Sequence, residues 1–101
     1  MLDAFEALAD PTRRAILALL RRGEQTAGTL VEMLALPQPS VSKQLRVLRE
    51  AGLVSARIDG PRRVYSIDPA PLAALDRWLA EYRPFWAARL DALGNHLERS
   101  D

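Results

Sequence analysis

The sequence predicts a single, mainly α-helical domain that carries a small β-hairpin, in the order α-α-α-α-β-β-α. Three observations predict it. Apolar residues recur at spacings of three and four through most of the chain, proline and glycine separate these stretches, and two runs containing β-branched residues flank a glycine near residue 60. Because 101 residues are the length of one domain, we expect one domain over residues 1–101.

Three helices are expected before residue 35. Residues 2–9 place apolar side chains at helical spacing and predict a short amphipathic helix. Asp10 and Pro11 predict the start of a second helix, because an aspartate accepts hydrogen bonds from the free N–H groups of a first turn and proline suits the first helical position. Thr26 is expected to cap a third helix that ends near Leu34.

The fourth predicted helix, over residues 38–51, has one apolar and one polar face. Val41, Leu45 and Leu48 share a stripe at about 100° per residue, and this stripe must pack on the rest of the domain. The polar candidates are Gln38, Ser40, Ser42, Lys43, Gln44, Arg46 and Arg49. Hydroxyls, amides and cations are the groups that bond base edges and phosphates, although an ordinary surface helix would also hold them in solvent.

A basic hairpin is expected after this helix. Two strand-like runs, 53–58 and 62–67, flank an Asp-Gly-Pro segment that is typical of a tight turn. Arg57, Arg62 and Arg63 gather near its tip, either as minor-groove or backbone contacts or as solvated charges. Helix, helix, turn, helix and a basic hairpin together make a winged helix-turn-helix.

The distribution of charge points to the same region. Residues 1–10 hold three acids and no base, residues 11–63 hold ten bases against four acids, and residues 64–101 hold four bases against six acids. A basic middle between two acidic ends suggests that a polyanion binds the middle. Composition alone permits chance clustering of solvated charges equally well.

The residue types suggest different roles within the basic region. Gln44 suits adenine and Lys43 suits guanine, while the arginines of the fourth helix are expected to grip phosphates, with Arg49 alternatively pairing with a nearby acid. Arg13 and Arg14, near the start of the second helix, are as suited to pairing with acidic side chains as to binding phosphate.

The final predicted helix covers residues 69–99. Its apolar residues recur every three or four positions, and Pro84 should kink it because proline removes one ladder hydrogen bond. The favoured interpretation is a homodimer through the first and last helices, with the candidate contacts Leu2, Phe5, Leu75, Leu79, Tyr82, Trp86, Leu90 and Leu93. The alternative is a pocket for an apolar effector, lined by Trp78, Tyr82, Phe85 and Trp86.

Three motifs carry a resemblance to a known family. Residues 9–17 (ADPTRRAIL), 38–54 (QPSVSKQLRVLREAGLV) and 60–67 (GPRRVYSI) resemble the opening, recognition-helix and wing motifs of ArsR-type bacterial repressors. The resemblance implies a DNA-binding core over 8–67, a C-terminal dimerisation helix over 69–99, and repression by a homodimer on a palindromic operator. Two positions depart from the family pattern: Pro37 replaces a frequent capping serine, and Gln44 stands where many members have histidine.

Several functions find no support in these residues. ArsR-type sensors often bind metals through cysteines on the third helix or through carboxylates and histidines on the last, but the chain has no cysteine and one histidine, His96, with Asp91 and Glu98 nearby. We therefore expect no metal and no cofactor. With no catalytic constellation, the chain is not expected to be an enzyme.

The remaining expectations concern location and partners. No apolar run approaches the roughly 20 residues of a membrane span, and the acidic N-terminus does not resemble a signal peptide, so a cytoplasmic protein without a membrane partner is expected. The expected partners are double-stranded DNA and a second copy of the chain, and the sequence identifies no small-molecule effector. The main rival is a protein-interaction module that kept the fold and lost DNA binding, but the intact cationic face of the fourth helix and hairpin counts against it.

Overall fold

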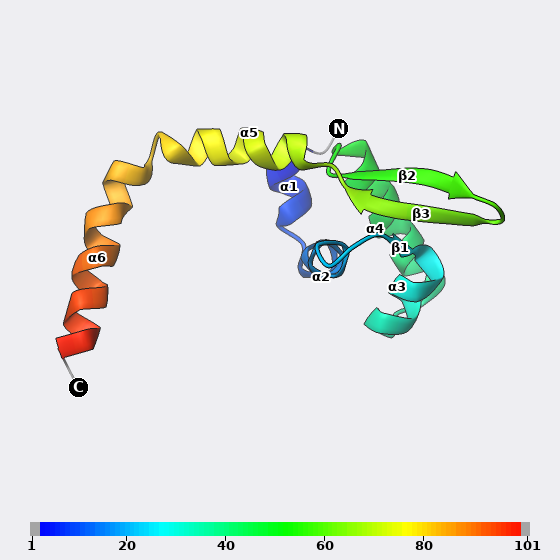
Figure 1. Cartoon of the computed structure of the whole chain (residues 1–101), viewed down its shortest axis with the longest axis horizontal. Coiled ribbons are helices and arrows are strands. Elements are labelled where there is room, and N and C mark those ends of the chain that lie inside the picture. Colours follow the sequence, from blue (N-terminus) through cyan, green and yellow to red (C-terminus); the bar gives the residue numbers. More distant parts are fainter. Residues whose placement is uncertain (1–2, 100–101) are drawn as a thin grey trace.

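The computed structural model describes the backbone of residues 3–99 and the side chains of residues 3–94. Figure 1 shows a body of helices and a hairpin, with two further helices leading away from it. In chain order the elements are α1 (Ala4–Leu8), α2 (Pro11–Leu20), β1 (Gln25–Thr26), α3 (Ala27–Leu34), α4 (Gln38–Glu50), β2 (Val54–Asp59), β3 (Arg62–Ile67), α5 (Pro69–Ala80) and α6 (Arg83–Arg99).

The starts of α2 and α3 confirm the predicted caps. The Asp10 carboxylate accepts a hydrogen bond of 3.0 Å from the backbone N–H of Arg13, and Pro11 occupies the first turn. Thr26 Oγ1 accepts one of 3.2 Å from the N–H of Thr29. Each side chain satisfies an N–H group that has no partner within its helix, which fixes where the helix begins.

One core holds the body together, and the predicted stripe of α4 lies at its centre. Val41, Leu45 and Leu48 are buried, with at most 1% of each residue exposed. They pack in one cluster with Ile16 of α2 and Leu30 of α3, among other apolar residues. The helix ends before Gly52, whose φ of +77° is the left-handed conformation expected of a glycine that follows a helix. The apolar stripe therefore fixes the orientation of the polar face of α4.

The sheet has three antiparallel strands in the order β1-β3-β2, one more than the sequence predicted. The β2–β3 hairpin pairs Asp59 with Arg62, so Gly60 and Pro61 form the two-residue turn, and Gly60 has a φ of +62°. β1 adds only Gln25 and Thr26, which pair with Tyr65 and Val64 in the middle of β3. Two residues are too short to show an alternating pattern, which explains why this strand was missed.

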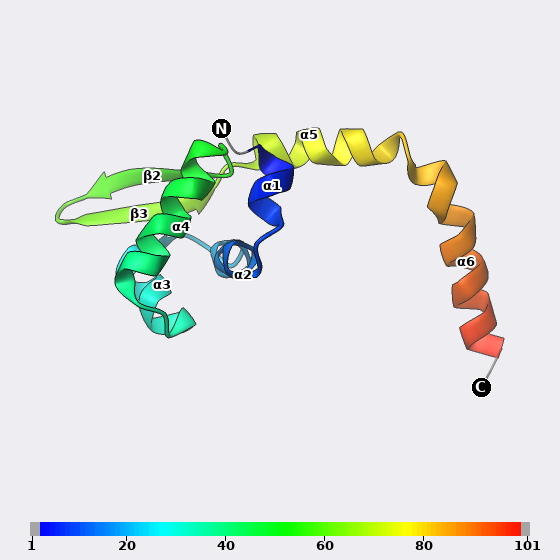
Figure 2. The same cartoon turned by 180° about the vertical axis from the view of Figure 1, so that it is seen from behind.

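The C-terminal segment is not the single kinked helix that was expected over 69–99. It forms two helices, because α5 ends at Ala80 and α6 begins at Arg83. Pro84 has no N–H group to donate to the preceding turn, so the ladder of α5 cannot continue through it, and Pro84 instead lies in the first turn of α6, where proline is tolerated. Figures 1 and 2 show α6 turning sharply away from the axis of α5.

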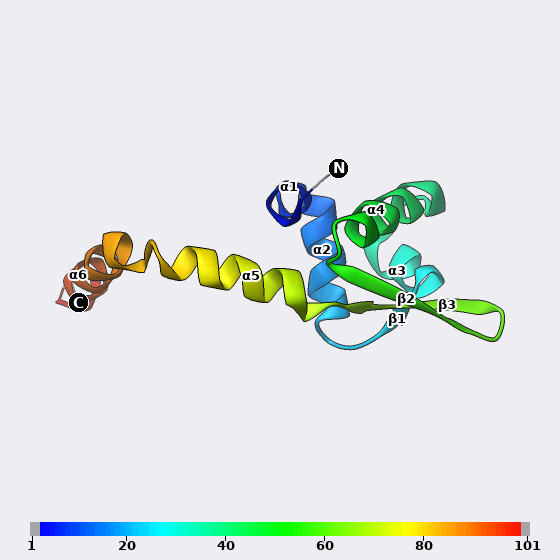
Figure 3. The ribbon, with the colours of Figure 1, turned by 90° about the horizontal axis from the view of Figure 1, so that it is seen from above.

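The two ends of the molecule point in opposite directions. Seen from above, α5 and α6 extend to one side of the helical body and the β2–β3 hairpin extends to the other (Figure 3). α5 packs beside α1, and near the end of α5 the rings of Phe5 and Trp78 meet edge to face with centroids 5.0 Å apart. Among the described residues, no helix is long and apolar enough to cross a membrane.

Candidate nucleic-acid interface

The polar face of α4 is presented to solvent and borders the hairpin. A groove of about 490 Å³ runs between them, lined by Pro39, Ser42, Lys43, Arg46, Arg49, Arg63 and Tyr65. Four of these seven residues are cations and none is acidic. A concave surface lined by cations attracts a polyanion, and guanidinium groups match the geometry of phosphate oxygens. Five residues predicted from the sequence thus come together here, from α4 and from the start of β3.

The other predicted residues of α4 lie outside this groove. Gln38 and Ser40 are exposed in the first turn, and Gln44 is half-buried on the flank that faces α2. The helix start has no side-chain cap at Pro37, in keeping with the absence of a serine there, and the Pro37 carbonyl accepts instead from the backbone N–H groups of Ser40 and Val41.

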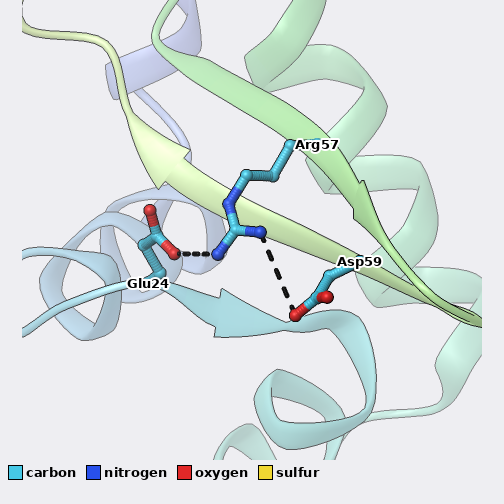
Figure 4. A network of polar contacts seen from close by, with 3 residues as sticks. All are labelled: Glu24, Arg57 and Asp59. Atoms are coloured by element: carbon cyan, nitrogen blue, oxygen red, sulfur yellow. Dashed lines mark hydrogen bonds and ion pairs between the residues drawn. The ribbon is translucent and has the colours of Figure 1, made fainter.

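Two arginines of the hairpin, Arg62 and Arg57, differ in whether they contact carboxylates. Arg62 is exposed and lines a second hollow, beside the start of α3. Arg57 donates to Glu24 at 2.7 Å and lies 4.0 Å from Asp59 (Figure 4). The Glu24 carboxylate, and to a smaller extent Asp59, raises the pKa of Arg57. The guanidinium of Arg57 is therefore shared between two carboxylates and ties β2 to the segment before β1.

The arginines at the start of α2 use their side chains within the domain, in a way that the sequence did not predict. Arg13 donates from Nη1 to the Gln44 side-chain oxygen at 2.9 Å and from Nε to the Ala7 carbonyl at 2.7 Å. Arg14 donates to the Leu8 carbonyl at 2.6 Å. Both arginines thus bond carbonyls of α1 rather than acidic side chains. The free carbonyls that end any helix were the available signal, but the partners depend on how α1 and α2 pack.

The comparisons with known proteins agree with this geometry. Residues 10–56 match the model described as "Bacterial regulatory protein, arsR family". The HTH-type transcriptional regulator Rv2034 of Mycobacterium tuberculosis is 43% identical over 96 residues, which cover 91% of this chain and 90% of that protein. The transcriptional repressor SdpR of Bacillus subtilis is 35% identical over 82 residues, covering 81% of this chain and 91% of SdpR.

The chain belongs to the arsR family of bacterial regulatory proteins. A solved neighbour supports the fold: the solution structure of the homodimeric winged helix-turn-helix DNA-binding domain Mb0332 from Mycobacterium bovis aligns with a TM-score of 0.63. It is 34% identical and covers 77% of this chain and 75% of that one. The winged helix-turn-helix predicted from the sequence is therefore confirmed, with α4 in the position of the recognition helix and β2–β3 as the wing.

The predicted dimerisation residues of this arsR-family chain are spread over α1, α5 and α6. Phe5, Leu79, Tyr82, Leu90 and Leu93 are exposed in the single chain, while Leu75 and Trp86 are half-buried and Leu2 lies outside the described residues. The proposed effector aromatics are only partly together. Trp78 lines a groove of about 570 Å³ between α1, α5 and the end of α4. Its ring is tilted against that of Tyr82 with centroids 4.6 Å apart, and the ring of Phe85 follows at 6.3 Å from that of Tyr82.

Potential metal ligands do not cluster in the part of this arsR-family protein whose side chains are described. Among the side chains that the structure describes, no three His, Cys, Asp or Glu residues gather in a group that could hold a metal ion. The side chains of His96 and Glu98 lie beyond those described.

Proposed function

We propose that this arsR-family protein is a sequence-specific transcriptional repressor that acts in the cytoplasm as a homodimer on a palindromic operator. The observation that carries the proposal is the groove between α4 and the wing, which four cations line and no carboxylate enters. α4 is held from behind by buried apolar residues, so its polar face is rigid enough to enter a major groove.

The side chains divide between reading and gripping DNA. Lys43 and Ser42 line the groove, and Lys43 would face base edges there. Gln38, Ser40 and Gln44 lie outside the groove on the same helix, where Gln44 would reach a base edge from the flank that faces α2. Arg46, Arg49 and Arg63 face the groove and would neutralise phosphates. Arg62, at the exposed start of β3, and Arg57 would contact the backbone or minor groove beside the wing.

The proposal of a dimer rests on the exposed apolar residues of α1, α5 and α6. A two-fold axis would place the two recognition helices in major grooves about one helical turn, or 10–10.5 base pairs, apart. Repression would follow because an operator occupied in this way overlaps the sequences that a polymerase needs. SdpR, which matches this chain along most of its length, carries the name of a repressor.

A gel shift with the DNA upstream of the protein's own coding sequence tests the function. We expect a complex that requires a palindrome and that weakens steeply with salt, because each phosphate contact releases counterions. Arg46→Ala should weaken binding to cognate and random DNA alike. Arg77→Ala is the matched control, because Arg77 is also an exposed arginine but lies on α5 and does not line the groove. A protein that dimerises but forms no complex at low salt would contradict the proposal.

A further inference from the structure

The side-chain amide of Gln44 has a fixed orientation. Its oxygen accepts the 2.9 Å hydrogen bond from Arg13 Nη1, across a part-buried contact between α4 and α2. A guanidinium carries only donors, so the atom that faces it must be the amide oxygen and not the amide nitrogen. Turning the amide over would set N–H groups against N–H groups and leave the oxygen without this partner.

Arg13 is itself held in place. Besides Gln44, it donates from Nε to the Ala7 carbonyl at 2.7 Å and from Nη2 to the Glu6 carbonyl at 3.2 Å. Both carbonyls belong to α1, and Ala7 is fully buried. The guanidinium is thus fixed by two helices besides its own, and it cannot follow Gln44 into another orientation without losing bonds to backbone carbonyls.

The hydrogen bond to Arg13 determines which group of the Gln44 amide can contact DNA. An amide oxygen has two lone pairs, but Arg13 holds this oxygen toward α2, which leaves the NH₂ group, with its two donors, as the end of the Gln44 amide that can turn to DNA. A glutamine that reads adenine uses both ends of the amide, accepting from N6 and donating to N7. Guanine presents two acceptors, O6 and N7, and thymine presents O4, so a donor alone suits these bases better.

We propose that Arg13 is a specificity-determining positioning residue that makes Gln44 a donor toward DNA, so that the operator carries guanine or thymine, and not adenine, where Gln44 meets it. The inference rests on the proposed function, since it requires α4 to lie in a major groove. It replaces the pairing with adenine that the residue type alone suggested.

Selection of bound sequences from random DNA tests the proposal with four proteins. The wild type should enrich guanine or thymine at one position of each half-site, and Gln44→Ala should lose that preference. Arg13→Met frees the amide to turn, so the same position should shift toward adenine by about tenfold, the size of one good base contact. Arg14→Met is the matched control, because Arg14 also bonds a carbonyl of α1 but does not touch Gln44.

A purely structural role for Arg13 gives a different result. It would weaken binding to all sequences alike and leave the preference at the Gln44 position unchanged, which would overturn the proposal. The double variant Arg13→Met/Gln44→Ala should have the base preference of Gln44→Ala, because Arg13 acts through Gln44. Independent effects on preference would equally contradict it.

A second variant covers the case in which Arg13→Met does not fold. Gln44→Glu keeps an oxygen for Arg13 but removes the NH₂ donors, so preference should move from guanine or thymine toward cytosine, whose N4 donates. An unchanged preference would overturn the proposal. Enrichment of adenine at this position by the wild type would also overturn the proposal, as would the lack of any position that depends on Gln44. Both results would leave the proposed function intact, because the palindromic complex would still form. Only the absence of any wild-type complex would remove the function itself.

Discussion

Single side chains of the wing differ in how much of their charge is available to DNA. Arg63 lines the cationic groove, whereas Arg57 shares its guanidinium with Glu24 and Asp59. The sequence placed both arginines in one basic cluster. It could not distinguish them, because Glu24 lies 33 residues from Arg57 and meets it only when β1 joins the sheet.

Substitution of Glu24 tests this difference. Glu24→Gln removes the main partner of Arg57, so we expect tighter DNA binding at low salt and a salt slope steeper by up to about one, the value of one added phosphate contact. Arg57→Ala should weaken wild-type binding less than Arg63→Ala does. Thermal stability should hardly change, because exposed ion pairs contribute little. Titrations of labelled DNA at several salt concentrations measure all of these effects, and equal losses for Arg57→Ala and Arg63→Ala would refute the difference.

At the scale of elements, the sequence predicted best what depends on local chemistry. The caps at Asp10 and Thr26 and the apolar stripe of α4 follow from side chains close together in the chain, and all three are confirmed. Pro84 predicted a kink, but the structure has a complete break. A kink becomes a break only when no tertiary packing holds the two halves in line, and the local sequence does not reveal such packing. The bond between Arg13 and Gln44 spans 31 residues and depends on how α2 packs against α4, so no local pattern could reveal it.

The stripe of α4 carries a prediction about stability. Leu45 of α4 is 1% exposed and belongs to the core cluster, so Leu45→Ala should lower the free energy of unfolding by about 2–5 kcal/mol. Met33→Ala on α3 is the control, because Met33 is 48% exposed and its truncation leaves no cavity. Urea unfolding at one fixed protein concentration measures both, since dimerisation makes stability depend on concentration. A loss for Leu45→Ala no larger than that for Met33→Ala would show that the stripe does not anchor α4.

On the scale of the whole molecule, α6 is the element that a single chain leaves least supported. It extends away from the helical body (Figure 1), and Phe85, Leu90 and Leu93 are 76%, 59% and 55% exposed. In proteins most helical stability comes from packing an apolar face against other parts of the structure. A second copy of the chain would supply that packing, and it would also pair two recognition helices across a palindrome.

Leu90→Asp tests whether α6 forms the contact between the two copies. A buried, unpaired carboxylate is costly, so the variant should shift the chain from dimer to monomer in sedimentation at micromolar concentration. The monomer should keep the winged helix-turn-helix, because Leu90 lies outside its core. It should bind the palindrome only as weakly as it binds a single half-site. Arg89→Ala, at the neighbouring exposed position, should remain dimeric and retain palindrome binding. A Leu90→Asp protein that stays dimeric and still prefers the palindrome would show that α6 does not hold the two recognition helices together.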